Sequence, residues 1–474
     1  MAAGAGMVAL GACANLNPAP ELPETEITQS AFAVGDSPLL APGEAPLSRW
    51  WEGFGDPALN ELVATVDAGN LSLEEAASRI VEAEARLDIA RAGLIPGGGV
   101  SAAYNRQQQG TATFEASGFP GAGSISPSAI DLYTLGADAS WEIDLFGRIR
   151  GGIDQAEAGL AAAEASRADL HRVLIGEAAG AWYSLLEIEA RRAIAEDAIA
   201  SQEDVLQLTR QLVEAGERAR LDISRQESLV ASTRASLAAL AGARADAVSG
   251  LAVLSGLTVP EFEARFGALA AKHGRARIVR SSADPIAIGE PAGLLRRRPD
   301  VRAAEWQLRA AAARVQVAAA DLYPSLSLGA SASLSATSVS GLTDDGAFGY
   351  NFGPRLNWGL FNYPRTLAGI DLSEAEMQTA AIRFEQAVLS ALTETDAALQ
   401  RYNAAVEEAI LRRRALSASR ETLRLVNARY EAGADSLLSL LDAQREFLGT
   451  EDSAAIAAYA VIRARIAVHR SLGG

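Results

Sequence analysis

The second half of this chain repeats the first half in register, and this duplication restricts the possible folds more than any other feature of the sequence. Leu94-Ile95-Pro96 matches Leu322-Tyr323-Pro324 at an offset of 228 residues. Further along, the offset is a constant 217 in the pairs Trp141 and Trp358, Arg148 and Arg365, and Gly216 and Gly433. The first copy therefore has the longer loop between its proline and its tryptophan. A repeat of this length indicates a duplicated architecture, not a solenoid of short modules.

Segments that alternate with a period of two follow the prolines in both copies. The clearest is 325–334, where Leu and Ala at even positions alternate with Ser and Gly at odd ones. Residues 131–145 and 347–361 alternate similarly, and residues 98–107 more weakly. About ten residues alternating between apolar and small or polar side chains are typical of an outer-membrane β-strand, apolar towards lipid and polar towards the lumen. For any one segment, a strand of a soluble β-sandwich is an alternative.

Two very long helical hairpins are expected after these strands. Residues 149–215 and 366–432 are rich in Ala, Glu and Arg and contain no proline. Each predicts a helix on the order of 100 Å long, at ~1.5 Å per residue. Their apolar residues recur at coiled-coil steps of seven, three and four. Gly216 and Gly433 end these helices, as glycine at a left-handed cap commonly does, and mark the tip of each hairpin.

A shorter helix is expected to precede each pair of strands and to end before its proline. Ser72 with Glu75 forms a capping-box pattern at the start of the first of these helices. Asp300 is the expected cap of the second. Arg296, Arg297 and Arg298 could suggest anion binding, but we expect them to be solvated beside this cap.

Four strands cannot close a barrel, and an open sheet edge cannot exist in lipid because its backbone groups would have no partner. The chain must therefore pool its strands with other copies. A symmetric trimer would supply about twelve strands, which lies within the known range of barrels. We therefore predict an α+β membrane protein, mainly helical, in which a trimeric 12-stranded outer-membrane β-barrel continues into a long periplasmic α-helical barrel.

Charge and motifs argue against several other functions. The net charge of −17 disfavours nucleic-acid binding and, in a pore, predicts a modest preference for cations. The sequence has no phosphate-binding loop, nucleophile elbow or zinc-helix motif. His171, His273 and His469 are far apart and lack metal-ligand spacing. We expect no enzymatic activity, no cofactor and no metal site, so energy for transport must come from a partner.

Cys13 is the only cysteine, which excludes a disulfide and a Cys-based metal site. It ends the short apolar run Met7-Val-Ala-Leu-Gly-Ala-Cys13, which resembles a bacterial lipobox with Cys13 as the lipidated first residue. Residues 1–12 lack Lys and Arg and are short for a signal peptide, so a start upstream of Met1 is one explanation and a chance cysteine is another. No run of about 20 apolar residues follows, which predicts no transmembrane helix.

Three motifs extend these inferences to a known family. They are Trp141-Glu-Ile-Asp-Leu-Phe-Gly-Arg-Ile-Arg150, Leu294-Leu-Arg-Arg-Arg-Pro-Asp-Val-Arg-Ala-Ala-Glu305, and Arg429-Tyr-Glu-Ala-Gly433 with Leu441-Asp-Ala-Gln-Arg445. The chain resembles the TolC/OprM-type outer-membrane factor family from Trp50 onward, and most closely its NodT-like lipoprotein branch. The resemblance implies a homotrimer that spans the outer membrane, contacts its lipid and works with a periplasmic adaptor (a membrane fusion protein) and an inner-membrane RND pump.

The repeat and the resemblance together predict the domain organisation. It comprises a signal-peptide remnant over 1–12, a lipidated N-terminal arm over 13–57, the first repeat over 58–256, an equatorial segment over 257–290, and the second repeat over 291–474. The resemblance implies that the equatorial segment and part of the arm form a mixed belt.

The resemblance also implies a periplasmic gate in the second hairpin, at Tyr430, Leu438, Asp442 and Arg445, and adaptor contacts at the tips near Gly216 and Gly433. Leu438, Asp442 and Arg445 follow at steps of four and three, so they share one helix face. Family members with two acidic rings carry the second one where Ser439 stands here. From the residues alone, Asp442 and Arg445 are equally an ordinary exposed ion pair, worth well under ~1 kcal/mol.

The expected function is a passive, gated exit duct for drugs or other small toxic compounds in a tripartite efflux system. Two alternatives remain. One is the exit duct of a type I protein secretion system, which neighbouring genes would distinguish. The other is a trimeric adhesin or stalk, whose helices would form a solid coiled coil and conduct no current.

Overall fold

The computed structural model describes residues 32, 37–41, 43, 49–108, 129–276 and 285–474. The chain divides into two compact units. The first contains residues 80–162 and 305–383, and the second contains residues 25–79, 163–304 and 384–474. Cys13 and the predicted signal-peptide remnant lie outside the described residues.

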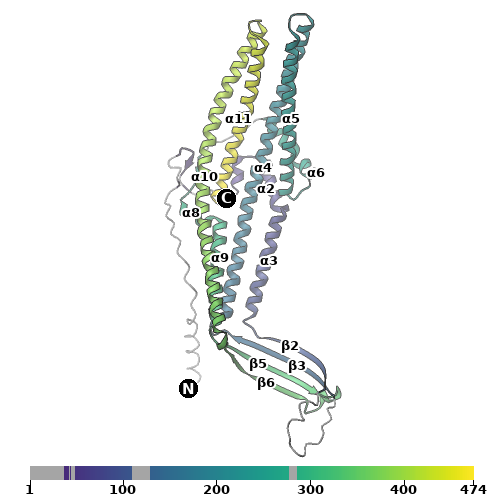
Figure 1. Cartoon of the computed structure of the whole chain (residues 1–474), viewed down its shortest axis with the longest axis vertical. Helices are drawn as coiled ribbons and strands as arrows, with labels where there is room; N and C mark the ends of the chain where they lie inside the picture. The colour runs from purple at the N-terminus through teal and green to yellow at the C-terminus, as the bar shows by residue number, and fades with distance from the viewer. Residues whose placement is uncertain (1–31, 33–36, 42, 44–48, 109–128, 277–284) are drawn as a thin grey trace, which may run out of the picture. The chain divides into compact units, whose positions relative to one another are not determined.

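The first unit is built on a four-stranded antiparallel sheet of order β2-β3-β5-β6 (Figure 1). The strands are β2 (Gly97–Gln107), β3 (Ile130–Ile143), β5 (Ser325–Ala336) and β6 (Phe348–Asn357). They lie where the period-two alternation predicted strands, including β2, whose pattern was weak. The central pair β3–β5 joins the two predicted copies, with Trp141 opposite Leu328.

A tryptophan ties each half of the sheet to the preceding helix. The Trp141 indole donates to the Leu94 carbonyl at 3.0 Å, and the Trp358 indole donates to the Leu322 carbonyl at 3.1 Å. Both acceptors follow the last turn of a helix, α3 (Leu71–Ala92) or α9 (Pro299–Ala320), where carbonyls lack intrahelical donors. The indoles therefore fix the direction in which the chain enters the sheet.

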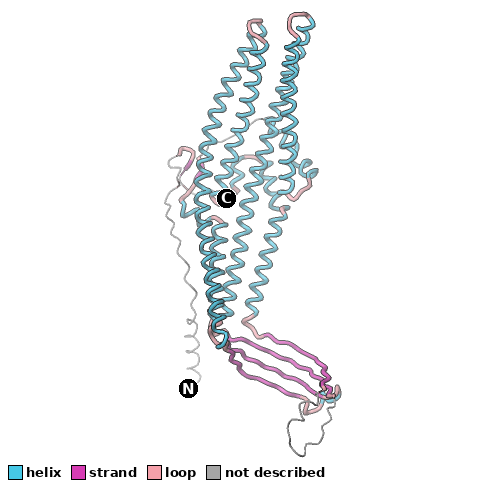
Figure 2. Tube along the Cα trace, viewed as in Figure 1, coloured by secondary structure: helices cyan, strands magenta, loops and turns pink. Residues whose placement is uncertain are grey.

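The hairpins have almost the predicted limits. They consist of α4 (Arg148–Glu214) with α5 (Arg220–Leu254), and of α10 (Tyr363–Glu431) with α11 (Leu437–Ser471). Figure 2 shows a short loop at the tip of each. Gly216 and Gly433 have φ of 78° and 73°, the left-handed conformation that glycine adopts without steric cost. In both tips the next residue, Glu217 or Ala434, donates its backbone N–H back over the last helical turn, which is a Schellman motif.

The first short helix pair begins differently from the prediction. Asp56 caps α2 (Pro57–Gly69) by accepting from the N–H groups of Ala58 and Leu59. The Asn70 side chain accepts from the N–H groups of Ser72 and Leu73, so Asn70 caps α3. The predicted capping box at Ser72 was therefore wrong, because Ser72 already lies inside the helix. A single residue between α2 and α3 both ends one helix and starts the next.

The segments around 257–290 pack against the roots of the hairpins in the second unit. They comprise α6 (Val259–Phe262), the π-helix η4 (Glu263–Gly267) and α7 (Ala268–Ala276), and α8 (Pro291–Arg297) follows. The 3-10 helices η2 (Trp50–Phe54), η5 (Ser340–Thr343) and η6 (Leu360–Asn362) lie elsewhere in the chain. Strand β1 (Leu40–Ala41) pairs in parallel with β4 (Ile286–Ala287). Phe32 and Trp50 are buried in two separate apolar clusters, so the N-terminal arm is anchored at both.

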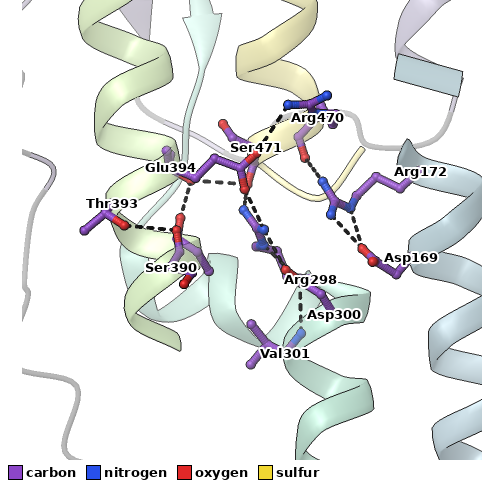
Figure 3. A network of polar contacts seen from close by, with 12 residues as sticks. Asp169, Arg172, Arg298, Asp300, Val301, Ser390, Thr393, Glu394, Arg470 and Ser471 are labelled. Atoms are coloured by element: carbon purple, nitrogen blue, oxygen red, sulfur yellow. Dashed lines mark hydrogen bonds and ion pairs between the residues drawn. The ribbon is translucent and has the colours of Figure 1, made fainter. Parts of the chain in front are cut away.

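Arg298 is the centre of a polar network that holds the C-terminal end of α11 (Figure 3). It is only 2% exposed, pairs with Asp300 at 2.6 Å and Glu394 at 2.8 Å, and donates to the Ser471 carbonyl at 2.9 Å. Arg172 of α4 donates to the Arg470 carbonyl at 2.7 Å. Our expectation of a solvated Arg298 was wrong, because its side chain donates to the Ser471 carbonyl at the helix end and to two carboxylates.

Burial alone would lower the pKa of the Arg298 guanidinium, but the hydrogen bonds and charges of Asp300 and Glu394 outweigh it and raise that pKa. Burial likewise opposes ionisation of Asp300, and Arg298 outweighs it, which holds the pKa of Asp300 below its usual value. Both groups are therefore charged at neutral pH. Asp300 also accepts from the Val301 N–H, but it lies inside α9, which begins at Pro299, so the predicted cap at Asp300 was wrong.

One described helix, α5, is long and apolar enough to cross a membrane by length and composition alone, which the sequence analysis did not predict. Arg244 in this helix pairs with Glu189 at 2.5 Å and with Glu263. Val248 and Leu251 of the same helix are buried in the first apolar cluster. These contacts pack α5 against protein, because an arginine in lipid would have no such partners.

Candidate membrane sheet and gate residues

One face of the sheet presents large apolar side chains to solvent. On β3 and β6 these include Leu135, Phe352 and Leu356, which are 47%, 68% and 65% exposed. The strand registers keep them on one face, because side chains two residues apart on a strand point the same way. A contiguous exposed apolar surface of this kind marks an interaction site.

Aromatic residues gather near both ends of this face. Tyr104 and Tyr133 lie with their ring centroids 4.9 Å apart, and Phe348 and Tyr350 lie 6.2 Å apart, at the end of the sheet near 107 and 130. Trp141 and Trp358 occupy the other end. Trp141 follows Tyr133 by eight positions, roughly 26 Å at ~3.3 Å per residue. An apolar band about 25 Å tall between two aromatic girdles is the outer surface of a membrane barrel.

The opposite face carries small and polar residues. On β3 they are Thr134, Gly136, Asp138 and Ser140, and Ser333 and Ser331 of β5 stand opposite Gly136 and Asp138. Strands β2 and β6 form the two edges, and within the described residues neither has a partner on its outer side. The sheet therefore has one lipid-like face, one aqueous face and two unsatisfied backbone edges.

Three of the four predicted gate residues share a surface at the start of α11. Leu438 is 47% exposed, and Asp442 and Arg445 are exposed, with Oδ1 and Nη1 3.6 Å apart. In the single chain these two side chains form a loose i,i+3 ion pair on a solvated helix. No described residue of the chain covers this face, so a constriction formed by it requires other subunits.

Tyr430 is separated from the other three. It is 8% exposed and packs against Leu437, Leu440 and Leu441, on the face of α11 opposite Leu438. The guanidinium of Arg218, at the tip of the first hairpin, lies 5.2 Å from the centre of its ring. Tyr430 therefore joins the two hairpins by a cation–π contact. Sequence analysis missed Arg218, since no pattern links position 218 to position 430.

The tip of the second hairpin is reinforced by side chains that the first lacks. The Ser436 hydroxyl accepts from the Ser439 N–H at 3.1 Å and caps α11, whereas Ala219 caps α5 without a side-chain bond. Asp435 accepts hydrogen bonds from Ser439 and the Ser436 N–H, which lower its pKa. Ser439, at the position of a second acidic ring in some relatives, is thus engaged in the helix cap.

The histidines are packed or solvated in the described chain. His469 stacks on Trp50 with ring centroids 5.3 Å apart, and burial together with Arg465 lowers its pKa to about 4, so it is neutral. His171 contacts Asp67 at 2.9 Å on the surface. Within the described residues there is no group of three or more His, Cys, Asp or Glu side chains that could hold a metal ion.

Known proteins resemble this chain over nearly its whole length. The Pseudomonas aeruginosa pyoverdine export outer membrane protein OpmQ is 30% identical over 98% of this chain and 94% of its own length. Nodulation protein T of Rhizobium leguminosarum bv. viciae is 28% identical over 95% of this chain and 89% of its own. The solved structure of the outer-membrane channel OprN is 32% identical, with a TM-score of 0.81 over 97% of this chain and 99% of its own.

The sequence model of the family described as outer membrane efflux protein matches residues 62–257 and 291–474. These ranges contain all four strands of the sheet and both hairpins. The apolar band, the polar opposite face and the long hairpins are the features expected of a channel with a membrane-spanning part. The chain belongs to the outer membrane efflux protein family.

Proposed function

We propose that this protein is the outer-membrane exit duct of a tripartite efflux system for drugs or other small toxic compounds. The observation that carries the proposal is the four-stranded sheet, which has an exposed apolar band on one face and two unpaired edges, in a chain of this channel family. Members of the family are channels of the outer membrane and not enzymes. The duct is passive, so an inner-membrane RND pump supplies the energy and a periplasmic adaptor connects the two.

A homotrimer follows from the two edges. A strand edge in lipid leaves backbone groups unpaired at several kcal/mol each, so β2 and β6 need partners. Three copies close a barrel of about twelve strands, which is wide enough to hold a lumen. The polar face of β3 and β5 then lines this lumen, and the hairpins of three copies surround the same axis as a periplasmic α-helical barrel.

The internal repeat is consistent with this arrangement. Helices α3 and α9 both have 22 residues, α5 and α11 both have 35, and α4 and α10 have 67 and 69. The family model also matches two separate ranges, one in each copy. Three chains with two similar halves each supply six hairpins of nearly equal length, which can pack side by side into a tube.

The gate lies at Leu438, Asp442 and Arg445. Repeated about the trimer axis, Leu438 forms an apolar constriction and Asp442 a ring of like charges that the neighbouring Arg445 side chains neutralise. Tyr430 contributes from inside the hairpin, because its contact with Arg218 couples the second hairpin to the first. The gate remains closed until the adaptor docks.

Adaptor docking involves the tips near Gly216 and Gly433, where a Cβ would meet no atom within 4 Å in the single chain. Gly433→Trp is therefore expected to impair export while sparing the barrel. The substitution also strains the backbone locally, because residue 433 has a positive φ. Compound accumulation in cells expressing the variant measures the first effect, and heat-resistant trimer on gels measures the second. Gly250→Trp, an open position near the C-terminal end of α5 and far from the tips, is the matched control. Normal export by the Gly433 variant would contradict tip contact.

A lipid on Cys13 anchors the N-terminal arm to the outer membrane, since the apolar run before it resembles a lipobox. Cys13→Ser is expected to abolish acylation and leave trimers intact, because the strands span the membrane without the anchor. Metabolic labelling with palmitate measures the acylation. A label that is still incorporated would exclude this site.

Conductance in planar bilayers tests the function as a whole. The purified protein is expected to give discrete channel currents with a modest preference for cations, given the net charge of −17. A solid stalk would give no current. Secretion of proteins through a type I system is the second candidate for the duct. The name of OpmQ refers to export of pyoverdine, a small molecule, which favours efflux.

A further inference from the structure

We propose which residues face each other in the seam between subunits, where β6 of one copy pairs with β2 of the next copy. Residue i of β6 lies opposite residue 458 minus i of that β2 strand. The partner is thus a second copy of this chain, and Asn357 faces Ser101 of that copy. The inference rests on the trimeric duct proposed above. It adds the pairing that closes the barrel, and it locates a weak point in each seam.

The first support is that the offsets of the sequence repeat correctly predict which individual residues pair between strands. In the first copy Gly97 of β2 lies opposite Ser140 of β3. Applying the sequence offsets of 228 to β2 and 217 to β3 predicts that residue 325 lies opposite residue 357. The structure has Ser325 opposite Asn357. The two offsets were read from the sequence alone, so the agreement is independent of the strand register.

The second support is the junction between the copies inside the chain. The last strand of the first copy, β3, pairs with the first strand of the second copy, β5, and Ser140 lies opposite Gly329. Around a closed barrel, β6 must meet the β2 strand of the next chain in the equivalent way. Shifting Ser140 by 217 and Gly329 by 228 in the opposite direction pairs Asn357 with Ser101.

Side-chain chemistry agrees with this register. On the polar face it places Asn357 opposite Ser101 and Asn351 opposite Gln107. On the apolar face it places Trp358 opposite Val100. A slip of one residue would place every apolar residue of β6 opposite the polar face of β2, at a large cost in lipid. Only slips of two residues preserve both faces, and these must be distinguished by experiment.

The junction also predicts a contact just outside the strands. Phe146, which follows β3, stacks on Tyr323, which precedes β5, with centroids 4.7 Å apart and planes at 9°. The equivalent residues are Tyr363 in one copy and Ile95 in the next. Both are exposed in the single chain, at 55% and 65%. Their pairing would cover both.

Pro354 creates a gap in the seam. The Ser335 N–H donates to the Ala347 carbonyl at 2.9 Å, so these residues form a hydrogen-bonded pair. Such pairs recur at every second residue of an antiparallel ladder. The backbone N–H and C=O groups of odd-numbered residues of β6 therefore bond to β5, and those of even-numbered residues point to the open edge. Pro354 is even and has no N–H. It lies opposite Tyr104 of the next copy, whose carbonyl is left without a donor.

The equivalent position at the internal junction is Ala137, opposite Ala332, where the N–H is present. Each subunit seam therefore has one hydrogen bond fewer than the junction within the chain. Proline is tolerated there because β6 is an edge strand until the subunits assemble. It also weakens the unassembled edge as a template for wrong strand addition.

Paired cysteines test the register. In the proposed seam Asn357 and Ser101 form a pair without backbone hydrogen bonds, with Cα atoms roughly 4.5 Å apart, which a disulfide can bridge. Within one chain the same residues are three strand spacings apart, about 14 Å, so only different subunits can be linked. The matched control combines Asn357→Cys with Ala103→Cys, a diagonal pair roughly 7–8 Å apart that cannot be bridged without distortion. Cys13 is common to both.

After mild oxidation and denaturation without reductant, Asn357→Cys with Ser101→Cys is expected to migrate as a covalent trimer, at least five times more abundant than for the control. Equal or stronger cross-linking by the control would overturn the register. If neither pair links while sedimentation in detergent still shows trimers, the register is wrong and the trimer stands. If sedimentation shows no trimer, the proposed duct fails as well.

Pro354→Ala supplies the missing N–H, so the temperature at which the trimer dissociates in detergent is expected to rise by a few degrees. Gly353→Ala is the matched control, since the N–H of Gly353 already bonds to β5 and its added Cβ meets no atom within 4 Å. An unchanged or lower dissociation temperature for Pro354→Ala, relative to this control, would overturn the placement of Pro354 in the seam.

Discussion

Asp442→Ala combined with Arg445→Ala is expected to raise the closed-state conductance of the trimer several-fold. In the single chain the two side chains are exposed and 3.6 Å apart, which gives a contribution well under ~1 kcal/mol. In the proposed trimer the same residues would alternate in sign in a confined ring, where attraction between subunits is less screened. Removing both therefore loosens contacts between subunits without leaving an uncompensated charge.

Leak current through single trimers in planar bilayers measures this effect. The matched control is Glu421→Ala with Arg424→Ala, an exposed pair on α10 at the same i,i+3 spacing and 2.7 Å apart. This control removes a stronger ion pair from a surface outside the proposed gate, so its conductance should remain at the wild-type level. Equal conductance of the gate variant and wild type would show that Asp442 and Arg445 form only an ordinary surface ion pair.

Arg298→Met is expected to destabilise the helical part of the protein by about 3–5 kcal/mol, because it leaves charged partners of a buried pair uncompensated. Asp300 and Glu394 would each lose a hydrogen-bonded cation, and the Ser471 carbonyl would keep only the Thr395 hydroxyl as a donor. The C-terminal end of α11 would then be held by Arg172 and by apolar packing. Circular dichroism of the detergent-solubilised trimer during thermal unfolding measures the loss.

Arg296→Met is the matched control, because Arg296 is exposed two residues earlier, in α8, which ends at Arg297. It is expected to change the unfolding temperature little. The pH dependence gives an independent check. The lowered pKa of Asp300 means that its stabilising contribution is present above its unfolded pKa of about 3.9 and is lost as pH falls through its folded value. Arg298→Met should therefore remove part of the acid-induced destabilisation; an unchanged acid profile would exclude the pair.

The elements themselves were predictable from local sequence. Alternation over 325–334 predicted β5, and a run free of proline that ends at Gly433 predicted α10 and its tip. These predictions succeeded because backbone geometry near a left-handed glycine or in a two-sided strand depends on residues close in the chain. The predicted cap at Ser72 failed because Asn70 caps α3 and also donates its side-chain amide to the Leu254 carbonyl, a contact that local sequence does not show.

The candidate sites divide in the same way. The spacing of Leu438, Asp442 and Arg445 predicted their common face, which one helix is sufficient to define. The separation of Tyr430 from that face and its contact with Arg218 required two hairpins to be placed together. The role of Arg298 depended on the end of a helix that begins 139 residues later, at Leu437.

By itself, the sequence determined the duplicated order of strands and hairpins, the apolar and polar faces of the sheet, and the need for further copies to satisfy its edges. These follow from periodicity and from backbone hydrogen bonding, which are local properties. Only the tertiary structure decided which strand joins the two copies, which side chains cap the end of α11, and on which side of β6 the backbone N–H of residue 354 is missing. Those features depend on contacts between residues far apart in the chain, and periodicity within a segment carries no information about them.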